Sequence, residues 1–119
     1  MTTDGPADVV PRRHLEAYLL LTLRRDGRSH GYELCETVRA HGLSVDLAGV
    51  YRALRSMDRR ELVSASWAPS ESGPDRREYV LTDAGRDAAD VAGHELARLR
   101  DALSEGLGAF GVTGTEQTA

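Results

Sequence analysis

Apolar side chains recur along the chain with the spacings of four helices and one pair of short strands. Three helices, in which apolar positions lie three and four residues apart, are predicted over residues 12–25, 30–41 and 47–60. Residues 62–67 and 76–81 flank a turn rich in Pro, Ser and Gly, and this pattern predicts a β-hairpin. A last stripe of Ala and Leu predicts a fourth helix over residues 82–105.

Polar residues and glycines at the ends of these segments predict where each helix begins and ends. The expected N-caps are Ser29, Asp46 and Thr82, because a short side chain can accept an unpaired backbone N–H there. Gly27 and Gly42 are expected to end the first two helices, and Gly106 to break the fourth. We therefore expect residues 1–11 and 106–119 to be flexible tails on a single domain.

The order of these elements is typical of a winged helix-turn-helix domain. Three helices, a hairpin and a fourth helix follow one another, and the link between the second and third helices is short. The predicted fold class is mainly α with a small β-hairpin (α+β). The winged helix-turn-helix is expected over residues 12–81, followed by a C-terminal dimerisation helix over residues 82–105.

The third predicted helix has an apolar side and an opposite side that carries arginine. Its apolar side holds Val50, Ala53, Leu54 and Met57. In a helix-turn-helix unit the second helix enters the major groove, where a guanidinium group can pair with guanine or with a phosphate. The expected DNA contacts are Ala48, Gly49, Tyr51, Arg52, Arg55 and Arg59 on this helix, Arg76 and Arg77 on the hairpin, and His30 and Tyr32 at the start of the second helix.

Several of these residues, and one tryptophan, also have other interpretations. Tyr51 lies at the margin of the third helix and is as readily a core residue as a DNA contact. Tyr32 and Tyr79 are more often packing residues, and His30 is either structural or a phosphate contact. Trp67 is expected in the core or at a subunit interface, with ligand stacking as the alternative.

The charge of the chain argues against nucleic-acid binding until its distribution is considered. The 119 residues carry 15 basic and 19 acidic side chains, a net charge of −4. Twelve arginines and nine acids fall within residues 12–77, whereas three arginines and eight acids fall within residues 78–119. The predicted DNA-binding body is therefore basic, and the C-terminal part is acidic.

The remaining composition favours a protein without catalytic, metal or membrane chemistry. A single cysteine, Cys35, cannot form an internal disulfide or a Cys-rich zinc site, and we expect it to be a small buried hydrophobe in a cytoplasmic protein. The four histidines lack metal-binding spacing, and no nucleophile–base pair or phosphate-binding loop is present. The longest mainly apolar run, residues 17–23, is too short to cross a membrane. We expect no cofactor and no enzymatic activity.

Three stretches of the chain resemble the PadR-type regulators, the phenolic-acid-responsive repressor family. Residues 30–34 (HGYEL) resemble the start of that family's second helix. Residues 51–67 resemble its YRALRRLEEEGLV-x-S-x-W stretch, and residues 73–85 its GPxRRxYxLTxxG hairpin and cap. Two positions depart from the pattern. Glu61 replaces a Gly that lets the chain leave the third helix with a positive φ, and Gly49 replaces a Thr or Ser.

The resemblance implies a homodimeric transcriptional regulator, usually a repressor, that binds double-stranded DNA at a pseudo-palindromic operator. It fits the short subfamily with one C-terminal helix, in which that helix and often the first helix contact the partner subunit. The expected dimerisation residues are Leu15, Leu19, Ala88, Ala92, Leu96, Leu99 and Leu103. Some family members hold a small-molecule effector at the dimer interface. The alternative function is a winged-helix protein–protein adaptor without DNA binding, which the net charge and Gly49 favour.

Overall fold

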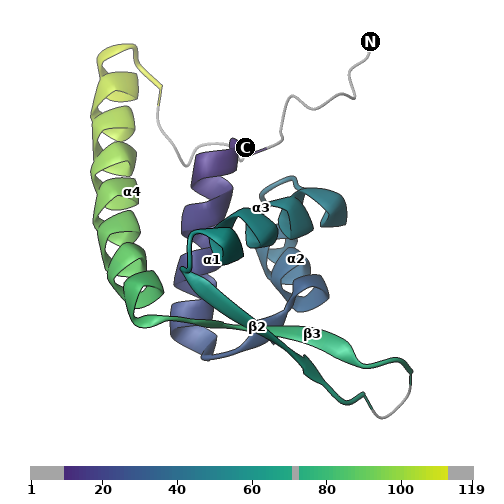
Figure 1. The fold of residues 1–119 in the computed structure, drawn as a ribbon. Coiled ribbons are helices and arrows are strands. Elements are labelled where there is room, and N and C mark those ends of the chain that lie inside the picture. The colour runs from purple at the N-terminus through teal and green to yellow at the C-terminus, as the bar shows by residue number, and fades with distance from the viewer. Residues whose placement is uncertain (1–9, 71–72, 113–119) are drawn as a thin grey trace.

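The fold is a three-helix body with a β-hairpin wing and a long C-terminal helix (Figure 1). The structure, a computed structural model, describes residues 10–70 and 73–112, so residues 1–9 and 113–119 of the two expected tails lie outside the described residues. The helices are α1 (Arg12–Asp26), α2 (Gly31–Ala40), α3 (Leu47–Arg59) and α4 (Asp83–Ala109). The strands are β1 (Ser29–His30), β2 (Val63–Ala68) and β3 (Arg76–Leu81). The predicted α+β winged-helix fold is confirmed.

The sheet contains one strand more than the predicted hairpin. Its antiparallel order is β1-β3-β2, and the two-residue strand β1 pairs Ser29 with Tyr79. Ser29 therefore belongs to a strand, and the N-cap of α2 is His30, so the prediction that Ser29 caps this helix is wrong. A two-residue strand is too short to show an alternating pattern in the sequence, which explains why it was not predicted.

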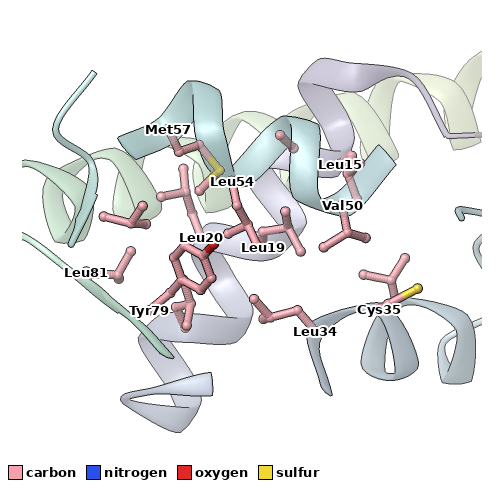
Figure 2. Close-up of a cluster of buried hydrophobic side chains, with 14 of the residues drawn as sticks. Leu15, Leu19, Leu20, Leu34, Cys35, Val50, Leu54, Met57, Tyr79 and Leu81 are labelled. Atoms are coloured by element: carbon pink, nitrogen blue, oxygen red, sulfur yellow. The ribbon is translucent and has the colours of Figure 1, made fainter. Parts of the chain in front are cut away.

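The core gathers around α1, which lies between α2, α3 and α4 (Figures 1 and 2). The inward side of α3 was predicted correctly, because all four of its apolar residues are fully buried: Val50, Ala53, Leu54 and Met57. Cys35 is buried as expected. Leu15 and Leu19 are also buried within this core, so their side chains are not free for the expected contact with a partner subunit.

Helix α4 lies alongside α1 and then continues beyond it (Figure 1). It packs through Ala89, which is fully buried, and the Arg24 guanidinium on α1 lies 3.3 Å from the Asp90 carboxylate. The helix continues through Gly106 to Ala109, so the predicted break at Gly106 is wrong. A glycine inside a helix costs only about 1 kcal/mol of helix stability relative to alanine. The cost of Gly106 and Gly108 is therefore smaller than the stability that the surrounding helix-forming residues provide.

Candidate nucleic-acid interface

Helix α3 presents its arginines to solvent on the side opposite the core. The Asp46 carboxylate caps the helix by accepting the backbone N–H of Gly49 at 2.7 Å. Arg52, Arg55 and Arg59 are exposed. Within the part of the chain that the structure describes, none of these three forms an ion pair, whereas the neighbouring Arg60 lies 2.6 Å from the Glu16 carboxylate. The positive charge of the outer side is therefore not neutralised by close acids.

The start of α2 is held by a reciprocal capping arrangement. His30 Nδ1 accepts the backbone N–H of Glu33 at 3.4 Å, and the Glu33 carboxylate accepts the backbone N–H of His30 at 3.3 Å. The Ser29 hydroxyl donates to the same carboxylate at 3.0 Å. His30 Nε2 lies 2.9 Å from a guanidinium nitrogen of Arg76 on the wing. The structure therefore supports the structural role predicted for His30, as the N-cap of α2. Its contact with a phosphate stays a prediction.

The two tyrosines predicted at this face have different surroundings. A Cβ atom at Gly31 would lie 2.4 Å from the Tyr51 ring, so only glycine lets that ring pack against the backbone of α2. Tyr51 is half-buried, packs against the core and joins α3 to the start of α2, which supports its packing role; its contact with DNA stays a prediction. Tyr32, on the first turn of α2, is 57% exposed.

The wing carries an exposed aromatic ring beneath a guanidinium group. Trp67 on β2 pairs with Arg77 on β3, and the Arg77 guanidinium lies 5.3 Å from the indole centroid, a cation–π contact. Trp67 is 63% exposed, so it does not lie in the core, and its expected place at a subunit interface stays a prediction. Tyr79, on β3, is buried, as expected for a packing residue, and burial raises the pKa of its phenol.

The fold brings most of the predicted contacts together on one face. A single groove is lined by His30, Tyr32, Tyr51, Arg55, Arg76 and Arg77. Gly49 and Arg52 line a second hollow at the N-terminus of α3, together with Arg12, which the sequence did not suggest. No local pattern could have linked Arg12 to this face, because α1 and α3 meet only in the folded chain. The backbone N–H of Gly49 is already donated to Asp46, so it is not free for a phosphate.

No group of three or more His, Cys, Asp or Glu side chains among the described residues could hold a metal ion. None of the described helices is both long and apolar enough to cross a membrane. Burial raises the pKa of the Cys35 thiol, which keeps it in the unreactive protonated form.

Comparison with solved structures identifies the same fold in several bacterial regulators. A transcriptional regulator of Streptococcus is 26% identical with a TM-score of 0.67, and the match covers 78% of this chain and 90% of that one. A PadR-like regulator of Bacillus cereus is 24% identical with a TM-score of 0.71, covering 81% and 93%. PadR of Bacillus subtilis, solved in complex with operator DNA, is 22% identical with a TM-score of 0.58, covering 67% and 46%.

The sequence comparison assigns a family. No curated protein sequence matches the chain. Residues 19–91 match the family described as the transcriptional regulator PadR-like family. This match spans most of α1, all of α2 and α3, the wing and the start of α4, which includes the arginine side of α3 and both wing arginines. The chain therefore belongs to the PadR-like family of transcriptional regulators.

Proposed function

We propose that this protein is a sequence-specific DNA-binding repressor that binds a pseudo-palindromic operator as a homodimer. Helix α3 enters the major groove, and the wing lies against the adjacent backbone. The observation that carries this proposal is the exposed side of α3, where Arg52, Arg55 and Arg59 have no ion pair with any described acid. An arginine row that served only solubility would be expected to pair with Asp58 or Glu61 nearby.

The roles of the three arginines differ along the helix. Arg52 and Arg55 lie on the second and third turns of α3, nearer its N-terminus than Arg59, and N-terminal residues of this helix contact the base edges in helix-turn-helix complexes. Arg59 lies on the last turn and is assigned to a phosphate. Arg76 and Arg77 contact phosphates from the wing. PadR of Bacillus subtilis, which shares the fold, was solved in complex with operator DNA, and this supports DNA binding by the fold in general.

The dimer is proposed to form through the part of α4 that extends beyond α1. The side of α4 that packs on α1 in its N-terminal half continues toward the C-terminus as an exposed apolar side. Its residues are Leu99, Leu103, Leu107 and Phe110. Leu103 is 56% exposed and Phe110 83%. A helix that leaves such an apolar side in water is poorly stable alone, and a second copy of the same helix would cover it with two-fold symmetry. Ala88, Ala92 and Leu96 are half-buried in the protomer and border this contact.

A test of the dimer compares Leu103→Glu with Ser104→Glu. The second change adds the same charge on another side of α4 and serves as the matched control. Sedimentation at several concentrations should show a dimer for the wild type and for Ser104→Glu, and a weakened dimer for Leu103→Glu. Equal association of all three proteins would exclude this part of α4 as the contact.

The DNA proposal is tested with an operator selected from random DNA fragments. Arg55→Ala should lower affinity by at least about tenfold and relax the sequence preference, since a good bidentate base contact contributes about 1–3 kcal/mol of discrimination. Arg98→Ala, an exposed arginine on α4, is the control and should bind as the wild type. Affinity should fall steeply with salt, with a logarithmic slope of about −0.9 for each phosphate contact. Normal binding by both Arg52→Ala and Arg55→Ala would refute the groove assignment.

One observation favours the adaptor function instead. The Asp46 carboxylate stands at the N-terminus of α3 and occupies the N–H of Gly49, where a phosphate would otherwise be attracted by the helix dipole. If the wild-type protein at about micromolar concentration retards neither selected nor promoter DNA at low salt, where non-specific binding is strongest, the adaptor function replaces the DNA-binding one.

A further inference from the structure

The wing exposes a large aromatic ring on the face that turns toward the helices. Trp67 is 63% exposed, whereas Tyr79 on the neighbouring strand is buried in the core. Trp67 pairs directly with Arg77 across β2 and β3, so both side chains lie on the same face of the wing. Tyr79 follows two residues farther along β3 and shares that face. The exposed indole therefore borders the groove between the wing and α3.

The indole of Trp67 holds the guanidinium group of Arg77. The guanidinium carbon lies 5.3 Å from the ring centroid, within the distance of about 6 Å at which a cation is attracted to an indole face. Burial raises the pKa of the Tyr79 phenol, and the nearby positive charge of Arg77 partly opposes this rise. An aromatic ring orients a cation without neutralising it, whereas a carboxylate partner would cancel its charge.

Arg77 has carboxylates in the same groove and pairs with none of them. Asp58 lines the groove from α3, and Asp75 lines it from the residue before β3. Within residues 10–70 and 73–112, Arg77 forms no ion pair with any acid. Contact with the indole therefore coincides with a guanidinium group that keeps its full charge and its hydrogen-bond donors for another partner.

We propose that Trp67 is a positioning residue of the wing: its indole holds the Arg77 guanidinium apart from Asp58 and Asp75, oriented for a phosphate of DNA. An arginine side chain loses conformational freedom when it is fixed at an interface, and fixing it before the partner arrives reduces this cost of binding. The phosphate contact rests on the proposed DNA-binding function. The holding of Arg77 by Trp67 does not, and it is measured separately.

The first measurement needs no DNA. The heteronuclear NOE at Arg77 Nε reports whether this side chain is ordered on the picosecond-to-nanosecond timescale. We expect an ordered side chain in the wild type and in Trp67→Phe, which keeps a ring face for the guanidinium. Trp67→Leu keeps an apolar side chain without a ring, and it should leave Arg77 mobile. Circular dichroism and urea midpoints should show all three proteins folded. Equal mobility of Arg77 in the wild type and in Trp67→Leu would overturn the positioning role.

The second measurement is the affinity for the selected operator over a range of salt concentrations. Trp67→Leu should lower the affinity by about two- to fivefold, the size of an exposed cation–π contact, and Trp67→Phe should recover most of this loss. Arg77→Gln should reduce the logarithmic salt slope by about 0.9, because one phosphate contact is lost. Trp67→Leu changes no charge, yet it should reduce the slope in the same direction. A lower affinity with an unchanged slope would show that Trp67 acts only by its own contact or by supporting the wing, and would overturn the proposal.

A double-mutant cycle provides the matched control. The effects of Trp67→Leu and Arg77→Gln on operator affinity should be non-additive, because the second change removes the group that the first releases. Arg76, the next residue, is hydrogen-bonded to His30 at 2.9 Å, so the effects of Trp67→Leu and Arg76→Gln should add. Additive effects in the cycle with Arg77 would overturn the proposal. A wild-type protein that binds no DNA would refute the proposed function and the phosphate contact with it, while the NOE would still decide whether Trp67 holds Arg77.

Discussion

The exit from α3 offers a sharp test of how the backbone accommodates an unfavourable residue. After the C-cap Arg60, Glu61 has a φ of 63°, and among the described residues it is the one non-glycine with a positive φ. The backbone N–H of Glu61 donates to Asp58 at 2.9 Å, and that of Leu62 donates to Met57 at 2.9 Å. These two bonds form a Schellman motif, in which glycine normally holds the left-handed position.

Replacing Glu61 by glycine should stabilise the protein by about 1 kcal/mol. The left-handed conformation costs a residue with a Cβ about 1–2 kcal/mol. The greater freedom of glycine in the unfolded chain offsets about 0.5–1 kcal/mol of the gain. Glu61 also places a negative charge at the C-terminus of α3, and removing it adds about 0.3 kcal/mol or more. A gain of this size raises the Tm by about 3–6 °C for a domain of this length.

The measurement is urea and thermal unfolding at one fixed protein concentration, because the proposed dimerisation would make the Tm depend on concentration. Glu61→Ala removes the charge but keeps the Cβ, so it should gain only a small part of the effect. Gly42 is the reciprocal control: it has a φ of 89° in the equivalent motif after α2, and Gly42→Ala should lose about 1 kcal/mol. If Glu61→Gly is no more stable than Glu61→Ala, the backbone explanation is wrong.

Three further predictions concern buried groups. Burial raises the pKa of the Cys35 thiol, so a disulfide reagent should modify it only as fast as the chain unfolds; reaction at the rate of a free thiol would contradict its burial. Burial likewise raises the pKa of the Tyr79 phenol, so the folded state favours the neutral phenol. The stability that the neutral phenol contributes is lost as the pH rises above 10.0, the usual pKa of this group. Raising the pH through this value should therefore lower the urea midpoint of Tyr79→Phe less than the urea midpoint of the wild type. Gly31→Ala should destabilise by about 1–3 kcal/mol, because its Cβ meets the Tyr51 ring at 2.4 Å. A double-mutant cycle with Tyr51→Ala should recover part of this loss, and strictly additive effects would exclude the contact as the cause.

The features of the fold that were predictable are those encoded within a few residues. The apolar side of α3 follows from the helical period alone, and Val50, Ala53, Leu54 and Met57 are all fully buried. Asp46 and Thr82 were identified as caps because the residue type and its position before an apolar run are both local signals. At Glu61 the departure from the family's glycine left two outcomes open, a different exit from α3 or a strained one, and the structure keeps the left-handed exit with a φ of 63°.

The features that were missed depend on contacts between distant segments. Ser29 has the better side chain for a cap, but pairing with Tyr79 in the sheet holds it in a strand, and His30 caps α2 instead. Trp67 is a residue type typical of cores, yet it lies near the end of β2 on the wing, where it is exposed and the Arg77 guanidinium stacks on its ring. Leu15 and Leu19 were assigned to a dimer because the sequence does not show how much of α1 is already covered.

The connections between the wing and the helix-turn-helix decide how the proposed DNA-binding face can move. Strand β1 leads directly into α2 and pairs with β3, so the start of α2 and the wing share one sheet. The Arg28 guanidinium lies 3.4 Å from the Glu78 carboxylate and adds a second link, and Tyr51 joins α3 to the same start of α2. A hinge motion of the wing away from α3 would break the pairing of Ser29 with Tyr79 and the contact between His30 and Arg76. We therefore expect the wing and the start of α2 to stay together when the protein binds DNA, because a hinge between them would cost both contacts.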